Sequence, residues 1–172
     1  MKAIVIYSSL TGNTKKIAEA IYEAIPFNKD IIKLGEKDIN IEEYDIVVAG
    51  YWVDKGTCDD KIKDILEKIN NKEVMIFGTL GAADKGEYYD KIKERIEEIL
   101  PENNKILGHF LCQGKINEKL TDRYKVMLKE NPDDIHIKEQ LKNHMEAKSH
   151  PDEKDIKNAK EFTENALRNI IK

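Results

Sequence analysis

The stretch KAIVIYSSLTGNT, residues 2–14, places an apolar strand directly before a polar loop. Residues 2–7 are almost continuously apolar, as expected of a strand that is covered on both faces of its sheet. The hydroxyl and amide side chains that follow bury little apolar surface, and residues 14–25 then carry isoleucine and alanine at helical spacing. This order of strand, polar loop and helix predicts a parallel crossover with a ligand site at the end of the strand.

Apolar runs of strand length alternate with amphipathic stretches as far as residue 112. The central strands have nearly continuous apolar centres, and each is followed by a helix, as parallel crossovers require. The fold class is therefore α/β, with one open sheet. Strands are expected at residues 2–7, 30–34, 44–51, 73–78 and 105–112, with helices at 14–25, 60–69 and 88–100.

The pattern changes beyond residue 112, where the chain becomes helical. Two short helices are expected at 118–130 and 137–147, separated by the sequence NPDD. A third, within 150–172, starts with a proline and acidic residues, as a helix N-terminus should, and its apolar stripe could cover one face of the sheet. Because the chain has no linker or repeat, we predict a single domain over 1–172, with a core at 1–112 and a helical extension at 113–172.

The composition disfavours several classes of protein. The 33 acidic and 29 basic residues give a formal net charge of −4, and the bases are scattered, so no nucleic-acid partner is expected. No apolar run could span a membrane and no signal peptide is recognisable, which predicts a cytoplasmic protein without a membrane partner. Cys58 and Cys112 are expected to be free thiols. The spacing of His136, His144 and His150 does not suit a metal site, so no metal is predicted and these histidines are expected at the surface.

The loop at residues 8–14 has the chemistry of an anion site. It lies at the carboxyl end of a parallel strand and leads into a helix, so its backbone amides and the helix dipole would suit a phosphate. Its hydroxyl and amide side chains add donors, and Gly12 permits a tight curve. The alternative is that Asn13 or Thr14 simply caps the helix.

This loop differs from the common phosphate-binding loops. It has no lysine after its glycine, as the triphosphate loop GxxxxGK[ST] requires, and it has one glycine instead of the three of GxGxxG. It also lacks the acidic residues of a receiver domain and the cysteine and arginine of a small tyrosine phosphatase. Donors that are all neutral favour a bound monophosphate.

The motif SxTGNT at residues 9–14 resembles the phosphate loop of flavodoxins, which bind FMN non-covalently. The resemblance covers roughly residues 1–112, and it implies a flavodoxin-like three-layer sandwich, a five-stranded parallel sheet of order 2-1-3-4-5, and an FMN phosphate on the loop. The tail from residue 113 departs from a short-chain flavodoxin, which normally ends in one helix. A flavodoxin-like subgroup that accompanies bilirubin reductase is similar in the segments GYWVDKGT (50–57), FGTLGA (77–82), LCQGKI (111–116) and SHPDEKDIKNAKEF (149–162).

The other loops at the same edge would then surround the flavin ring. Of the aromatic pair Tyr51 and Trp52, one is expected to stack on the ring, with Trp52 favoured, and the other to face the core. The peptide between Lys55 and Gly56 would lie near N5 of the ring, where the resemblance implies a carbonyl that stabilises the one-electron reduced form; the alternative is an ordinary turn glycine. Residues 78–81 would offer backbone amides to the polar edge of the ring. The predicted cofactor-binding residues are Ser9, Leu10, Thr11, Gly12, Asn13, Thr14, Tyr51, Trp52, Val53, Lys55, Gly56, Thr79, Leu80, Gly81, Cys112 and Gln113.

One functional prediction and two alternatives follow. The chain is predicted to be an FMN electron carrier that passes electrons between a reductase and a partner redox enzyme, and the resemblance implies a partner like bilirubin reductase. Lys55, Lys85 and Lys115 would make the docking edge less acidic than is usual in flavodoxins. The first alternative is an FMN-dependent NAD(P)H reductase of a small acceptor such as a quinone, with a cavity roofed by residues 115–150. The second is a flavin-free protein-binding module.

Overall fold

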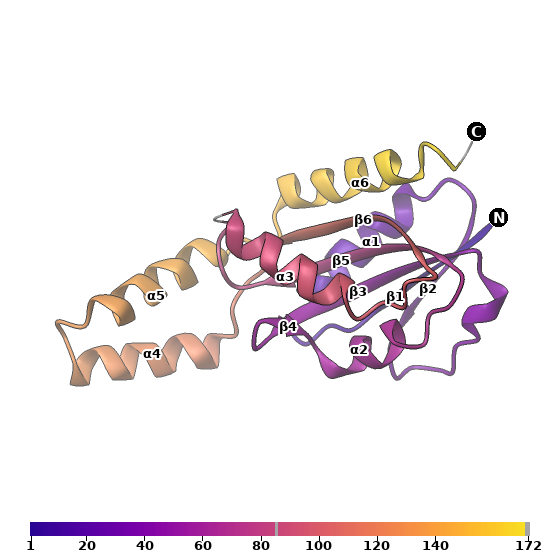
Figure 1. Ribbon diagram of the computed structural model, residues 1–172. Helices are drawn as coiled ribbons and strands as arrows, with labels where there is room; N and C mark the ends of the chain where they lie inside the picture. The colour runs from indigo at the N-terminus through magenta and orange to yellow at the C-terminus, as the bar shows by residue number, and fades with distance from the viewer. Residues whose placement is uncertain (85, 171–172) are drawn as a thin grey trace.

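Five parallel strands form the sheet at the centre of the computed structural model, which describes residues 1–84 and 86–170 (Figure 1). Their order is β2-β1-β3-β5-β6, which confirms the order 2-1-3-4-5 of the five predicted strands. The short strand β4, absent from the sequence prediction, pairs antiparallel with the end of β3. The strands are β1 (Lys2–Tyr7), β2 (Asn28–Lys33), β3 (Ile46–Asp54), β4 (Thr57–Cys58), β5 (Glu73–Leu80) and β6 (Lys105–Gln113).

Helices cover both faces of this sheet and give the predicted three layers. One face packs against α1 and α6, and the other packs against α2 and α3. Isoleucines at helical spacing, such as Ile17 and Ile21 of α1, are fully buried in these layers. Among the described residues, no helix is long and apolar enough to cross a membrane. The four helices are α1 (Asn13–Ala24), α2 (Asp60–Leu66), α3 (Glu87–Glu97) and α6 (Glu153–Leu167), and a 3-10 turn spans Ile41–Glu43.

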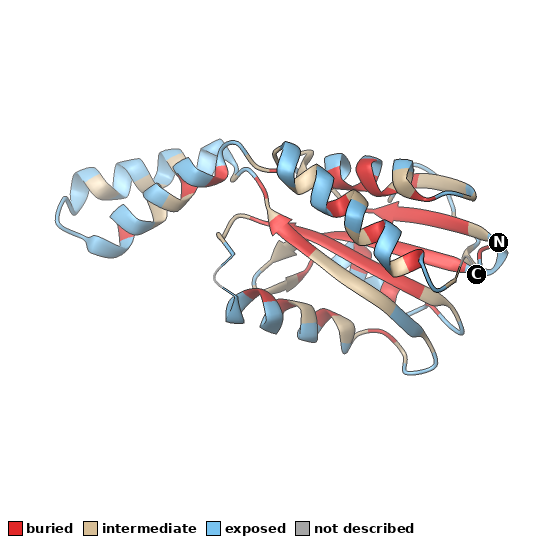
Figure 2. Ribbon diagram, turned by 90° about the horizontal axis from the view of Figure 1, so that it is seen from above, coloured by how far each residue is buried: buried red, intermediate tan, exposed pale blue. Residues whose placement is uncertain are grey.

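The two short helices predicted beyond β6 are present as α4 (Glu118–Glu130) and α5 (Ile135–Ala147). They form a hairpin that extends away from the sheet, and most of its surface is exposed (Figures 1 and 2). No residue of α4 is buried. The hairpin is therefore inserted between the last strand and the last helix, outside the three layers.

Two glycine–aromatic pairs determine the packing at the carboxyl ends of the central strands. Gly50 of β3 is paired with Phe77 of β5, and Tyr51 is paired with Gly78. A Cβ atom on Gly50 would lie 2.0 Å from the Phe77 ring, and one on Gly78 would lie 2.3 Å from the Tyr51 ring. Each ring therefore occupies the space above the glycine of the neighbouring strand, and the two rings pack into the cores on opposite faces of the sheet.

A buried polar chain joins this end of β3 to β6 and α3. The Tyr51 hydroxyl lies 2.8 Å from Nε2 of His109, and Nδ1 of His109 lies 2.9 Å from a carboxylate oxygen of Glu97. The Tyr51 side chain is fully buried, and the His109 side chain is 3% exposed. Burial lowers the pKa of His109 more than Glu97 raises it, so the imidazole is neutral at pH 7. Its Nε2 therefore accepts the hydrogen of Tyr51, whose pKa is raised by burial.

Both cysteines are free and buried, which confirms the prediction of free thiols. Burial raises the pKa of Cys58 to about 11 and that of Cys112 well above its usual range. Both thiols are therefore protonated at neutral pH, and neither is an activated nucleophile.

We expect His109 to make the free energy of unfolding fall as the pH falls. Because its pKa in the folded protein is lowered, the unfolded chain binds more protons below the ordinary histidine value of about 6.5. The free energy of unfolding of the unaltered protein should fall between about pH 7 and pH 5.5, and that of His109→Leu should fall less steeply. Urea unfolding at a series of pH values measures both slopes, and equal slopes would contradict a buried, neutral imidazole.

Candidate cofactor-binding site

The loop after β1 encloses the N-terminus of α1. Gly12 is the N-cap residue with a φ of 90°, a left-handed conformation that favours glycine, so the alternative in which Asn13 or Thr14 caps the helix is wrong. Oγ of Ser9 accepts hydrogen bonds from the amides of Gly12 at 3.1 Å and Lys15 at 3.4 Å. Within the described part of the chain, the amides of Asn13 and Thr14 have no acceptor. They lie at the positive end of the helix dipole and are available to an anion.

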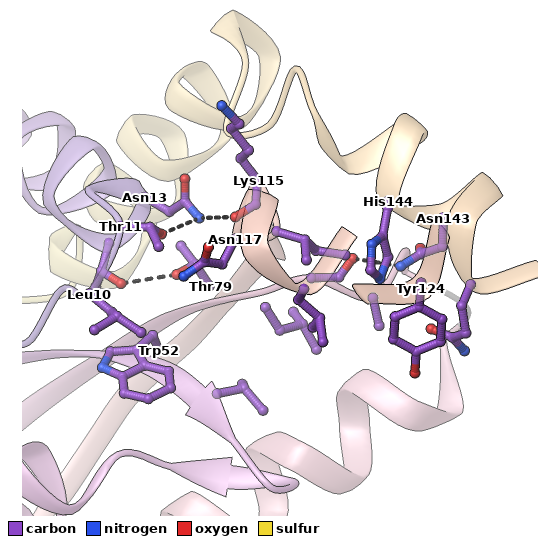
Figure 3. A pocket seen from close by; sticks show the side chains of 18 residues that line it. Leu10, Thr11, Asn13, Trp52, Thr79, Lys115, Asn117, Tyr124, Asn143 and His144 are labelled. Carbon is purple, nitrogen blue, oxygen red and sulfur yellow. Dashed lines mark hydrogen bonds between the residues drawn. The ribbon is translucent and has the colours of Figure 1, made fainter. Parts of the chain in front are cut away.

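Asn13 presents a different donor from the one expected, whereas Thr11 keeps its hydroxyl donor. Nδ2 of Asn13 donates to Oγ1 of Thr11 at 3.1 Å and to the carbonyl oxygen of Lys115 at 2.8 Å (Figure 3). Both amide hydrogens of Asn13 are thus used within the chain, and a ligand would meet its backbone amide instead. Since Thr11 only accepts in this contact, its hydroxyl hydrogen remains available.

Thr14 and Thr79 connect the first loop to the ends of the central strands. Their Oγ1 atoms lie 3.0 Å apart, and Oγ1 of Thr14 lies 3.4 Å from the carbonyl oxygen of Tyr51. Both side chains are buried. The first turn of α1 is therefore held on β3 and β5 by hydroxyl groups.

A cavity of about 330 Å³ opens beside this loop at the carboxyl ends of the strands (Figure 3). Small-molecule sites span roughly 300 to 1,000 Å³, so this volume suits a single ligand. The loops after β1 and β5 and the end of β3 all contribute to its wall, as expected for an open parallel sheet. The predicted residues that line the cavity are Leu10, Thr11, Asn13, Thr14, Trp52, Val53, Thr79, Leu80 and Gly81.

The aromatic pair at the end of β3 divides between the core and the cavity. Tyr51 is fully buried over Gly78, so its side chain is not available to a ligand and contributes only the carbonyl that Thr14 contacts. Trp52 is half-buried and lines the cavity (Figure 3). A strand directs successive side chains to opposite faces, which accounts for this division.

Lys55 and Gly56 form the two-residue turn between β3 and β4 and do not line the cavity. Their φ values of 49° and 82° are typical of a hairpin turn in which both central residues are left-handed. The Gly56 carbonyl accepts a hydrogen bond from Nη1 of Arg95 at 3.2 Å. Gly56 is thus a turn glycine, and the carbonyl expected near the flavin N5 stays a prediction.

Four further predicted residues also lie outside the cavity lining. Ser9 and Gly12 stabilise the conformation of the first loop, through the hydrogen bond between them and through the left-handed N-cap at Gly12. Cys112 is buried in the core formed with α1 and α6. Gln113 contacts the loop after β5 instead of the cavity: its Nε2 donates a hydrogen bond to the carbonyl oxygen of Gly81 at 3.0 Å.

The lysines expected at this edge are placed differently from one another. Lys115 lines the cavity, with its ammonium group 2.9 Å from a carboxylate oxygen of Glu118. Lys55 lies in the hairpin turn, and Lys85 lies outside the described residues.

The hairpin and the segment before it form the opposite wall of the cavity, where the reductase alternative of the sequence analysis expected a roof at residues 115–150 without naming the residues that line it. Figure 3 shows Tyr124 of α4 and Asn143 and His144 of α5 directed toward it. The sequence does place the polar residues Gln140, Asn143 and His144 on one face of α5, at spacings of three and four residues. An ordinary solvent-exposed helix face has the same pattern, so it did not identify the wall of a cavity. The additional lining residues are Ala82, Lys115, Ile116, Asn117, Leu120, Tyr124, Gln140, Asn143 and His144.

His144 corrects the prediction that these histidines lie at the surface. It is 6% exposed, because α4 covers it: Nδ1 lies 2.9 Å from Oγ1 of Thr121, and its ring meets the Tyr124 ring edge-on. Burial lowers the pKa of His144, so it is neutral at pH 7. His136 is exposed, and His150 is half-buried with Nδ1 2.6 Å from a carboxylate oxygen of Asp155.

A family model described as the flavodoxin domain matches residues 4–164. The flavodoxin-like domain-containing protein BilS of Clostridioides difficile (strain CD3) is 54% identical over 170 residues, with 97% of each chain covered. A solved flavodoxin of Streptococcus pneumoniae has a TM-score of 0.60 at 15% identity and covers 98% of this chain and 99% of its own. A flavoprotein of Lactobacillus acidophilus NCFM, solved in complex with FMN, has a TM-score of 0.52 at 20% identity, with 64% of this chain and 92% of its own covered.

We expect Gly81→Ala to disturb the contact between the loop after β5 and the start of the hairpin. A Cβ atom on Gly81 would lie 2.5 Å from Cγ1 of Ile116, so one of the two segments must move. Overpacking of this kind costs about 1–3 kcal/mol, which urea unfolding would measure. The double variant Gly81→Ala with Ile116→Ala should lose less stability than the sum of the single variants, because the smaller side chain makes room. Strictly additive losses would contradict this close packing.

Proposed function

Because the chain belongs to the flavodoxin domain family, we propose that it binds FMN in this cavity and carries electrons between a reductase and a partner redox enzyme. The observation that carries the proposal is the pair of unbonded amides, Asn13 and Thr14, at the N-terminus of α1 beside the cavity. Such a helix terminus binds anions, and phosphate is among those it commonly binds. The FMN bound by the Lactobacillus acidophilus flavoprotein supports the choice of flavin.

The first loop fits a phosphomonoester held by neutral donors. The amides of Asn13 and Thr14 and the hydroxyl of Thr11 have hydrogens to donate, and all three residues line the cavity. Lys15, the first cation of the helix, does not line the cavity, and its ammonium group lies 3.8 Å from a carboxylate oxygen of Glu19. Amides and the helix dipole therefore supply the attraction at the loop itself.

The remaining cavity residues fit a planar ring. Trp52 at the end of β3 and Leu10 in the loop after β1 offer apolar faces, and Ile116 and Leu120 offer them from the opposite wall. When bound, FMN supplies the redox chemistry, since its ring accepts and releases electrons one or two at a time. The protein's part is to exclude water from the ring faces and to present backbone amides at the end of β5 to its polar edge.

The size of the cavity favours a carrier over a reductase with its own substrate pocket. A volume of about 330 Å³ accommodates one ligand, whereas a reductase would need further space for its acceptor above the ring. Electrons would then leave through an exposed edge during a transient protein contact. We propose a flavoenzyme like bilirubin reductase as the partner, because three of the segments that resemble the accompanying subgroup supply the cavity residues Trp52, Gly81 and Ile116.

Thr11→Val tests the phosphate end of the site. Removal of a donor to a bound phosphate should weaken FMN binding by about tenfold or more, which is the loss of one hydrogen bond to a charged group. Quenching of flavin fluorescence during titration of the FMN-free protein measures the affinity. Thr57→Val, in β4 and away from the cavity lining, serves as the matched control and should leave the affinity unchanged. An unchanged affinity for Thr11→Val would contradict the placement of the phosphate.

Stepwise reduction distinguishes the carrier from the reductase. The FMN-loaded protein should be reduced in two separate one-electron steps, visible as an intermediate absorption spectrum during titration with dithionite. It should consume NAD(P)H only slowly when a quinone is the sole acceptor. A single two-electron step together with rapid quinone reduction would support the reductase instead.

A further inference from the structure

The loop after β5 is bonded to the hairpin through the side-chain amide of Asn143, which α5 directs toward the cavity (Figure 3). Nδ2 of Asn143 donates to the carbonyl oxygen of Gly81 at 3.0 Å, and its Oδ1 accepts from the amide of Ala83 at 3.2 Å. Gln113 of β6 donates a second hydrogen bond to the same Gly81 oxygen, also at 3.0 Å. One side-chain amide therefore bridges two peptide groups on either side of Ala82.

These bonds determine which way the peptide groups of the loop face. The two lone pairs of the Gly81 carbonyl are both used, and the Ala82 carbonyl accepts a hydrogen bond from the Tyr89 hydroxyl at 2.8 Å. In a trans peptide the N–H of Ala82 points opposite to the C=O of Gly81, so anchoring that oxygen on Asn143 and Gln113 also fixes the direction of the N–H. As far as the structure describes the chain, the amides of Gly81 and Ala82 have no acceptor. They remain available to a ligand in the cavity that both residues line.

We propose that Asn143 is a positioning residue, which holds the loop at residues 81–83 in the conformation in which its amides meet the polar edge of the flavin ring. This inference rests on the proposed function, because it takes FMN as the ligand. Asn143 preorganises this loop, since both hydrogen bonds are formed within the chain and need no ligand. Without it the loop would have to be ordered during binding, and the cost of that ordering would reduce the affinity.

Three variants separate positioning from general stability. Asn143→Leu removes the hydrogen bonds to Gly81 and Ala83, and a longer one of 3.4 Å from Nε2 of Gln113 to Oδ1, at similar volume. Asn143→Asp keeps the acceptor for Ala83 but loses the donor to Gly81. Met145→Ala, on the same helix and 76% exposed, is the control. Amide hydrogen exchange at Ala83 is measured in the FMN-free protein, so this readout needs no cofactor. FMN affinity and the one-electron potentials are then measured on the loaded protein.

In Asn143→Leu we expect exchange at Ala83 to be about tenfold faster and FMN binding about tenfold weaker, with shifted potentials. In Asn143→Asp the Ala83 amide should stay protected while the affinity still falls, and Met145→Ala should match the unaltered protein. Unchanged exchange in Asn143→Leu would overturn the contact, and faster exchange with unchanged affinity and potentials would overturn its positioning role. If the unaltered protein itself does not bind FMN, the proposed function fails, whereas the exchange rates still decide whether Asn143 holds the loop.

Discussion

The structure depends on how β3 and β5 are aligned at their carboxyl ends. Each strand places a glycine opposite an aromatic residue of the other, and either glycine would clash with the facing ring if it carried a side chain. Side chains alternate between the two faces along a strand. With Tyr51 buried over Gly78, the side chain of Trp52 therefore points to the other face of the sheet, where it lines the cavity. A shift of one residue in this register would bury Trp52 and expose Tyr51, and it would remove the aromatic wall of the site. The hydrogen bond between Tyr51 and His109 makes this register more specific, since only a correctly placed tyrosine satisfies the buried imidazole.

A second constraint is the close approach of three chain segments above the strand ends. A Cβ atom on Gly114 would lie 2.7 Å from Nδ2 of Asn13, and this proximity is what allows Asn13 to donate to the Lys115 carbonyl. Gly81 permits an equally close contact with Ile116. The loop after β1, the loop after β5 and the start of the hairpin are therefore packed directly against one another. The hairpin is outside the layers of the fold, yet it is built into the site.

The sequence predicted the strands and helices of the sheet domain well because their physical signals are local, whereas the three-layer arrangement was implied by the family resemblance. Apolar periodicity located the strands and helices, and the polar loop after β1 indicated where a ligand would gather, although the strand order came from a resemblance and not from periodicity. Strand β4 was missed because two residues are too few to show the alternation of a strand. The turn before it was predicted only as one of two alternatives, in which Gly56 is an ordinary turn glycine. A roof at residues 115–150 was expected only under the reductase alternative, and its lining residues were not identified because Gln140, Asn143 and His144 look like a solvated helix face until the chain folds back over the cavity. His144 was assigned to the surface for the same reason, since its burial depends on Thr121 and Tyr124 of another helix.

Electrostatics explains why the orientation of one peptide group matters in this cavity. The chain has a net charge of −4, and Lys115, the one ionised side chain among the described residues that line the cavity, is paired with Glu118. Negative charge gained by a flavin on reduction would therefore meet little cationic compensation, which leaves the backbone dipoles at the end of β5 as the main stabilising groups. The effect of a dipole depends on its direction, whereas that of a point charge does not. A site that relies on amides therefore needs those amides fixed in advance, and the hydrogen bonds that Gly81 accepts from Asn143 of the hairpin and Gln113 of β6 hold its peptide group in one orientation.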